Sequence, residues 1–272
     1  MKIILLLICM CFGCSCVRKN ITSDIHIPLN VSITTLGRAG NTLPDGAELG
    51  IFVAEETPEG TYNGKSYQNI RAVITGGQLK LDEEVMLNST SANIYAYSPY
   101  NTTYTNPRKI KVSSKTESTK NFLVGKIEDV NLYNPSVTLV LQHIYSMVRI
   151  KIRNLSGDTR YAKLHTVLLR TNVEEANIDI LGDVDLKNCN IVPSTLRVPA
   201  INIPLNGNYE ISSSFPADEN SIDFLLIPMA VKTGEIVIQV TFQSGSTSRT
   251  FPIPAGKWNA GEINVYELTI TQ

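Results

Sequence analysis

The body of the sequence lacks a disulfide framework. Four of the five cysteines, Cys9, Cys11, Cys14 and Cys16, lie within the first sixteen residues, and only Cys189 lies well inside the rest of the chain. A single cysteine cannot form an internal disulfide. The remaining 256 residues must therefore be stabilised by burial of apolar side chains, and they are numerous enough for one large or two ordinary domains.

Long hydrophobic runs are also missing, apart from one at the start. Residues Ile3 to Phe12 follow Lys2 and precede Gly13-Cys14-Ser15-Cys16. This run is too short to span a bilayer, which takes about 20 apolar residues, so residues 1–16 are interpreted as a secretory signal peptide. A small residue precedes each of the last two cysteines. We expect lipidation at Cys14, with Cys16 as the alternative; an ordinary signal with incidental cysteines stays open.

The sequence shows no excess of one charge and no catalytic signature. It has 24 basic and 25 acidic residues, interspersed along the chain, which gives no indication of a nucleic-acid partner. None of the three histidines has metal-ligand spacing, and neither a Gly-x-Ser-x-Gly elbow nor a phosphate-binding loop is present. We therefore expect no enzyme activity, no metal and no cofactor. A hydrolase stays as a remote alternative, because sequence cannot show whether two carboxylates face each other.

What the sequence does have is a pattern of period two. Apolar and polar residues alternate in Lys109–Val112, Val148–Arg153 and Glu235–Phe242, and turn clusters such as Pro44-Asp45-Gly46 and Asn206-Gly207-Asn208 separate such runs. Many short strands with regular turns predict an all-β fold, and the length suggests two β-sandwich domains in series. We place the boundary near residue 130, with domains at 17–130 and 131–272.

Tyrosine is the one enriched aromatic residue, with eleven copies against seven Phe and one Trp. Four tyrosines lie close together at Tyr95, Tyr97, Tyr100 and Tyr104. Packing in the core is one interpretation of this group. The other is an exposed platform that binds a glycan or a host or bacterial surface protein.

Five segments together resemble the fimbrillin (Mfa-like) family of Gram-negative anaerobes, which builds type V pili. They occur in the family's order and span most of the chain, at residues 93–100, 121–125, 141–150, 224–229 and 257–268. The resemblance implies two transthyretin-like β-sandwich domains, lipoprotein export to the outer membrane and cell surface, and assembly with other fimbrial subunits by donor-strand exchange. It implies a role as shaft, anchor or adhesive tip, without deciding among them.

The resemblance also implies a maturation site. Family subunits are cut by an arginine-specific protease after their first strand. The candidate first strand, Asp24 to Thr35, is followed by Leu36-Gly37-Arg38-Ala39-Gly40, so the bond between Arg38 and Ala39 is the candidate site. A sandwich that loses an edge strand exposes unpaired backbone groups and an apolar groove, which an added strand repairs. An uncut Arg38 in a glycine turn stays open as the alternative.

The last strand has two interpretations. The run from Glu262 to Thr271 alternates apolar and polar residues with one slip at Val265-Tyr266. It could be donated to a neighbouring subunit or be a permanent core strand, and we favour the second. The basic residues Arg18 and Lys19, where surface-exported lipoproteins of these bacteria often carry acidic ones, leave an anchor facing the periplasm as a further possibility.

Overall fold

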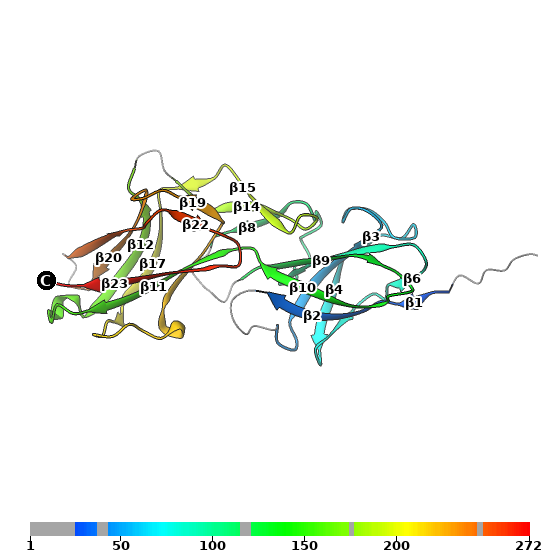
Figure 1. Ribbon diagram of the computed structural model, residues 1–272, viewed down its shortest axis with the longest axis horizontal. Coiled ribbons are helices and arrows are strands. Elements are labelled where there is room, and N and C mark those ends of the chain that lie inside the picture. Colours follow the sequence, from blue (N-terminus) through cyan, green and yellow to red (C-terminus); the bar gives the residue numbers. More distant parts are fainter. Residues whose placement is uncertain (1–24, 37–42, 115–120, 174–176, 244–246) are drawn as a thin grey trace, which may run out of the picture.

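The computed structural model describes residues 25–36, 43–114, 121–173, 177–243 and 247–272. The regular structure of these residues is almost entirely strand, with two short 3₁₀ turns, η1 (Thr159–Tyr161) and η2 (Asp218–Asn220). The molecule is elongated: β1 lies at one end and the C-terminus at the other (Figure 1). The predicted all-β fold of sandwich type is confirmed. Within the described ranges, no helix has the length and apolar character needed to cross a membrane.

The first module is a closed barrel, named here the barrel. Its strands follow the order β10-β2-β5-β4-β3-β7-β9. They are β2 (Asn30–Leu36), β3 (Glu48–Ala54), β4 (Tyr67–Thr75), β5 (Gln78–Leu81), β7 (Ala92–Ser98), β9 (Leu123–Val130) and β10 (Ser136–His143). A two-stranded ribbon of β1 (Ile27–Pro28) and β6 (Met86–Leu87) lies at its outer end. Inward residues of alternating strands, such as Leu139 and Leu141 of β10, fill one apolar core.

The second module is a two-sheet sandwich, named here the sandwich. One sheet has the order β18-β11-β23 and the other β17-β12-β20-β21. The strands are β11 (Ser146–Asn154), β12 (Lys163–Thr171), β17 (Ala200–Glu210), β18 (Ile222–Leu226), β20 (Ile236–Phe242), β21 (Ser248–Pro252) and β23 (Ile263–Ile270). Two ribbons flank them: β13 (Ile178–Asp179) with β16 (Arg197–Val198), and β19 (Met229–Val231) with β22 (Gly256–Trp258). The alternation predicted for residues 148–153 places Val148, Ile150 and Ile152 in the core.

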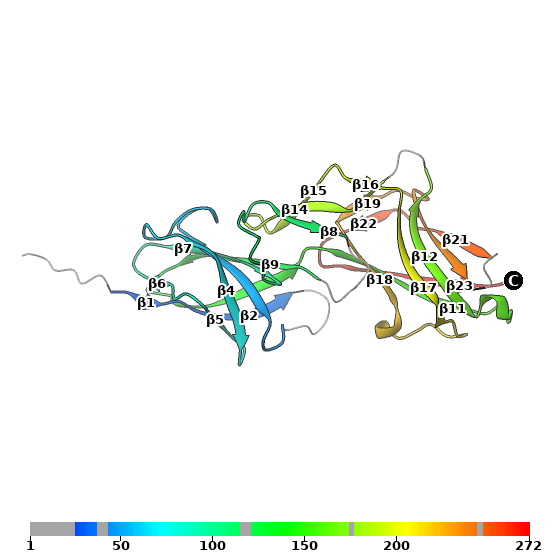
Figure 2. The same cartoon turned by 180° about the vertical axis from the view of Figure 1, so that it is seen from behind.

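A third apolar core joins the two modules. It combines barrel residues such as Phe52 and Tyr97 with Leu225 and Ile227 of the second module. A three-stranded sheet of β8 (Ile110–Ser113), β14 (Leu181–Asp185) and β15 (Asn190–Pro193) contributes to this core and lies near the junction of the two modules (Figures 1 and 2). The modules are thus packed against each other rather than joined by a free linker.

The sheets divide the chain at a different place from the predicted boundary near residue 130. Strand β10 lies beyond that boundary, yet it pairs with β2 and β9 of the barrel. The barrel strands end at His143, and the sandwich begins at Ser146. In addition, β8 lies between the barrel strands β7 and β9 in the sequence but pairs with β14 outside the barrel. The polar composition around residue 130 marks a turn within the barrel, because a polar loop connects strands of one module as readily as it connects two modules.

Candidate functional site

The first long strand, β2, fills a place between two barrel strands that come much later in the chain. It runs parallel to β10 over seven residue pairs, from Asn30 opposite Ser136 to Leu36 opposite Gln142. On its other side it pairs with β5 over two residues, at Val31 and Ser32. We call this space between β10 and β5 the β2 slot.

The inner face of β2 covers part of the barrel core. Val31 is 1% exposed, and Ile33 packs against the same core while partly exposed. The β10 residues beside them, Leu139 and Leu141, have 0% exposure. Loss of β2 would therefore uncover apolar side chains and leave a row of β10 backbone groups without their partners.

The outer face of β2 carries a small polar contact. The Ser32 hydroxyl donates a hydrogen bond to the Val137 carbonyl oxygen (3.2 Å) and lies 2.9 Å from the Thr138 hydroxyl. A shallow, largely polar hollow surrounds this contact, with Asn30 and Gln78 among its lining residues. The slot therefore holds apolar side chains on one face and short polar ones on the other, as expected of a strand with one face in water.

The predicted processing sites lie outside the described residues. These are the lipidation candidates Cys14 and Cys16 and the cleavage candidates Arg38 and Ala39. The elements on either side of Arg38 are known: β2 ends at Leu36, two residues before it, and β3 begins at Glu48, ten residues after it. Cleavage there remains a prediction.

The predicted tyrosine platform is wrong for its first two members. Tyr95 and Tyr97 are 1% and 0% exposed. The Tyr97 hydroxyl has two possible acceptors for its proton, Asn69 Oδ1 at 2.6 Å and the Asn101 carbonyl oxygen at 2.9 Å, and burial raises the pKa of Tyr97 to about 12. Tyr100 and Tyr104 are half-buried against the same core. The tyrosines are packed between the modules because the rings supply apolar area while each buried hydroxyl finds an acceptor.

The last strand, β23, is built into the sandwich core. It runs parallel to β11 over eight residue pairs. Leu268 and Ile270 are 8% and 1% exposed within the sandwich core. The buried Trp258 donates its indole N–H to the Tyr266 hydroxyl (2.9 Å), which ties the middle of the strand to β22. These contacts favour the permanent core strand over the donated one.

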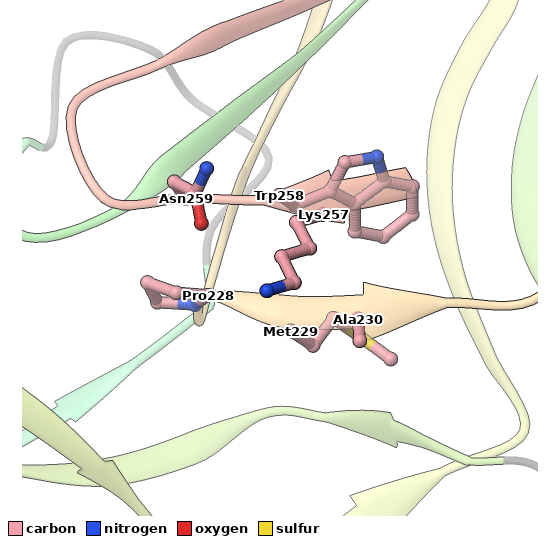
Figure 3. Close-up of a pocket in the computed structure, with 6 residues that line it drawn as sticks. All are labelled: Pro228, Met229, Ala230, Lys257, Trp258 and Asn259. Atoms are coloured by element: carbon pink, nitrogen blue, oxygen red, sulfur yellow. The ribbon is translucent and has the colours of Figure 1, made fainter. Parts of the chain in front are cut away.

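Other features of the described residues offer no competing site. A shallow hollow beside β19 and β22 is lined by Pro228, Met229, Ala230, Lys257, Trp258 and Asn259 (Figure 3). No group of three or more His, Cys, Asp or Glu residues is placed to hold a metal ion within the described part of the chain. His143 is buried and contacts Asn121 through Nδ1, and burial raises the pKa of the Cys189 thiol to about 11. A thiol with a raised pKa is a poor nucleophile.

Sequence reasoning missed the partners of β2. Each residue of β2 pairs with a residue of β10 that lies 106 positions later in the chain, and the pairing is parallel. A local pattern of apolar and polar residues identifies a strand without identifying the strand it pairs with. The glycine at position 125 is a sequence signal for the other neighbour of β10. A side chain there would meet the Val140 backbone oxygen, because β9 and β10 approach closely at that point.

Comparisons with solved structures agree on the fold. A candidate cell adhesion protein from Bacteroides uniformis matches with a TM-score of 0.65 and 16% identity, covering 91% of this chain and 94% of that one. A second, from Bacteroides ovatus, matches with a TM-score of 0.64 and 15% identity over 91% of this chain and 93% of the other. At such identities the likeness concerns the fold alone.

The comparison with protein families is more specific. No curated protein matches the chain. A family profile described as fimbrillin-like, however, matches residues 37–272. The match covers the barrel from the segment after β2 onward and the whole sandwich. The chain therefore belongs to the fimbrillin-like family.

Proposed function

We propose that this chain is a fimbrial subunit or fimbria-associated adhesin that joins its neighbours by accepting a strand into the β2 slot. The single observation that carries the proposal is the position of β2. It is the first strand of the barrel, it closes the barrel by pairing with β10, and Arg38 follows it by two residues. Cutting the chain there would leave β2 held only by non-covalent contacts.

The replacement strand must reproduce what β2 contributes. It needs apolar side chains at the places of Val31 and Ile33, and its backbone must pair with β10. Strand addition of this kind gains affinity from main-chain hydrogen bonds and specificity from alternate side chains. The proposed partner is therefore an extended, alternating segment of another fimbrial subunit.

The core position of β23 supports an accepting role for the chain in this exchange. Donating β23 would remove Leu268 and Ile270 from the sandwich core and break the Trp258–Tyr266 hydrogen bond. Burial of one large aliphatic side chain stabilises a fold by about 1.5–3 kcal/mol, so donation would be costly. We propose that β23 stays in place while β2 is exchanged.

In this scheme the lipidated N-terminus would bring the exported subunit to the outer membrane. A diacylglycerol on Cys14 or Cys16 would hold the exported chain at the outer membrane. Cleavage after Arg38 would separate that lipid from the body once β2 leaves. An uncut chain would remain a lipid-anchored protein at the cell surface, so cleavage decides between a fimbrial and an anchoring role.

The experiment compares the wild-type chain with Arg38→Ala after treatment with an arginine-specific protease. A fluorescent peptide with the sequence of residues 29–36 is then added, and its binding is followed by anisotropy. We expect the cut wild-type protein to take up the peptide in exchange for its own β2. The uncut Arg38→Ala protein should exclude it, because its β2 remains covalently attached.

A matched peptide tests the chemistry of the slot. Replacing the residues equivalent to Val31 and Ile33 by aspartate should abolish uptake, since both side chains face the apolar core. Replacing the residue equivalent to the exposed Asn30 by aspartate should leave uptake almost unchanged. A cleanly cut protein that binds none of these peptides would show that β2 is a permanent strand.

A further inference from the structure

Two pairs of parallel strands connect the two ends of the molecule. In the barrel, β2 lies along β10 over seven residue pairs; in the sandwich, β11 lies along β23 over eight. All four strands run roughly along the long axis (Figures 1 and 2). The chain enters β2 from the β1 end of the molecule and leaves β23 at the opposite end.

This arrangement decides how a pull on the two ends acts on each pair. β2 is drawn outward by its first residue, whereas β10 is held through its last residue, His143, which leads into β11. In the same way β23 is drawn outward by its last residue, and β11 is held through its first, Ser146. The strands of each pair are thus pulled in opposite directions along their length. All the backbone hydrogen bonds between them share the pull, because those bonds are evenly spaced along a parallel pair.

The connection between the two pairs has no slack. Only Ile144 and Tyr145 separate β10 from β11, and they are 1% and 0% exposed. The Ile144 N–H donates to the Phe122 carbonyl oxygen (3.2 Å), and the Tyr145 hydroxyl donates to the Ser113 carbonyl oxygen (2.8 Å). The linker is therefore fixed to neighbouring segments and cannot act as a hinge.

Additional hydrogen bonds cross each pair. In the sandwich, Arg153 Nε donates to the Thr269 hydroxyl (3.0 Å), and Asn264 Nδ2 donates to the Ser146 hydroxyl (2.9 Å). At the end of the same pair, the Leu155 N–H donates to the Ile270 carbonyl oxygen (2.9 Å). Sliding of one strand past the other breaks these contacts together with the backbone ladder.

We propose that the molecule resists tension along its long axis through these two strand pairs acting in series. We call each pair a shear clamp: the barrel clamp is β2 with β10, and the sandwich clamp is β11 with β23. When the two strands of a clamp are pulled past each other, their backbone hydrogen bonds must break together. Peeling the strands apart from one end instead breaks one residue pair at a time. The inference goes beyond the proposed function and does not require cleavage at Arg38. A donated strand that runs parallel to β10 in the β2 slot would be loaded in the same direction.

Single-molecule force spectroscopy on the full, uncut chain tests the proposal. An azide-bearing amino acid replaces two residues at a time, so that handles attach without thiol chemistry. Handles at Ile25 and Gln272, both exposed, pull along the long axis and load both clamps. Handles at Leu36 and Gln142 pull apart the adjacent ends of β2 and β10 and peel the barrel clamp from one end. Both exchanged positions in the second pair are also exposed, so each labelled protein should fold.

We expect the unfolding force along the long axis to exceed the peeling force by about twofold or more at the same loading rate, since forced unfolding reports the barrier to unfolding. Thermal unfolding of the two labelled proteins should give the same midpoint, which excludes a difference in stability as the cause. Equal forces, or a lower force along the long axis, would overturn the proposal. Neither outcome depends on whether the protein polymerises.

Discussion

The barrel and the sandwich close in the same way but hold their closing strands differently. Each module pairs its first long strand with its last in parallel. In the barrel, β2 places one fully buried side chain, Val31, and one partly buried side chain, Ile33, against the core. In the sandwich, β23 buries both Leu268 and Ile270 in the core. The comparison shows that similar backbone pairing can hold closing strands that bury different amounts of apolar side chain.

The largest effect should come from truncating matched isoleucines in the two closing strands. Ile270→Ala should lower the free energy of unfolding by about 2–5 kcal/mol, because a side chain that is 1% exposed leaves a cavity. Ile33→Ala should cost clearly less, since Ile33 is partly exposed. Urea unfolding measures both. Equal losses would mean that β2 is held as firmly as β23.

A smaller difference should separate ion pairs of the two modules. In the sandwich, Arg149 and Asp223 are 12% and 9% exposed and form two hydrogen bonds of 2.9 and 2.8 Å. Asp223→Ala should cost about 1.5–3 kcal/mol, the range for hydrogen bonds to charged groups. Glu48→Ala in the barrel removes a solvent-exposed partner of Arg71 and should have little effect.

The control for this prediction is Asp223→Asn, which keeps one oxygen acceptor and should lose less stability than Asp223→Ala. Chemical denaturation at neutral pH compares the variants. A loss on Glu48→Ala as large as that on Asp223→Ala would contradict the contrast in burial between the two pairs.

Alkaline pH should weaken the contact between the modules. Burial raises the pKa of Tyr97 to about 12, against about 10 for an unfolded tyrosine. Above pH ~10 the unfolded state loses this proton while the folded state keeps it, so stability should fall as pH rises toward 12. The contribution of this group should be below about 1.4 kcal/mol per pH unit. Tyr97→Phe should flatten the slope between pH ~10 and 12, and an unchanged slope would contradict this assignment.

The smallest effects should come from the polar contacts that cross the two clamps. Ser32→Ala removes the contact with Val137 and Thr138 in the barrel, and Thr269→Val removes the acceptor of Arg153 in the sandwich. Cross-strand pairs of this kind contribute about 0.2–1 kcal/mol. Thermal unfolding should show the larger loss for Thr269→Val, since its donor is charged. The reverse order would show that charge does not set the strength of these contacts.

The local structure was largely predictable, because it depends on side chains close in sequence. The alternation at residues 148–153 placed Val148, Ile150 and Ile152 on one face, and all three are buried. The pairing of strands was not predictable in this way. Neither β2 with β10 nor β8 with β14 joins neighbours in the chain. For the same reason composition did not indicate that β10 pairs with barrel strands on both sides.

The candidate site also has one part that the sequence indicated and one part that only tertiary packing decided. The resemblance to the fimbrillins pointed to Arg38 as the candidate cleavage site after a candidate first strand. The burial of Tyr95 and Tyr97 was not, because a tyrosine suits a core and an exposed surface equally well. Only tertiary packing decided between the two interpretations: both tyrosines lie in the core between the modules, and the Tyr97 ring contacts Phe52 of β3 and Phe122, just before β9.

The sequence by itself determined that the body is all-β, that it has no internal disulfide, and that it resembles the fimbrillins. These properties follow from composition, local alternation and short motifs, each of which is contained in a few consecutive residues. Only the tertiary structure decided that β2 closes the barrel against β10 and that β23 is embedded in the sandwich core. Strand pairing and burial depend on residues far apart in the chain, and those come together only when the chain folds.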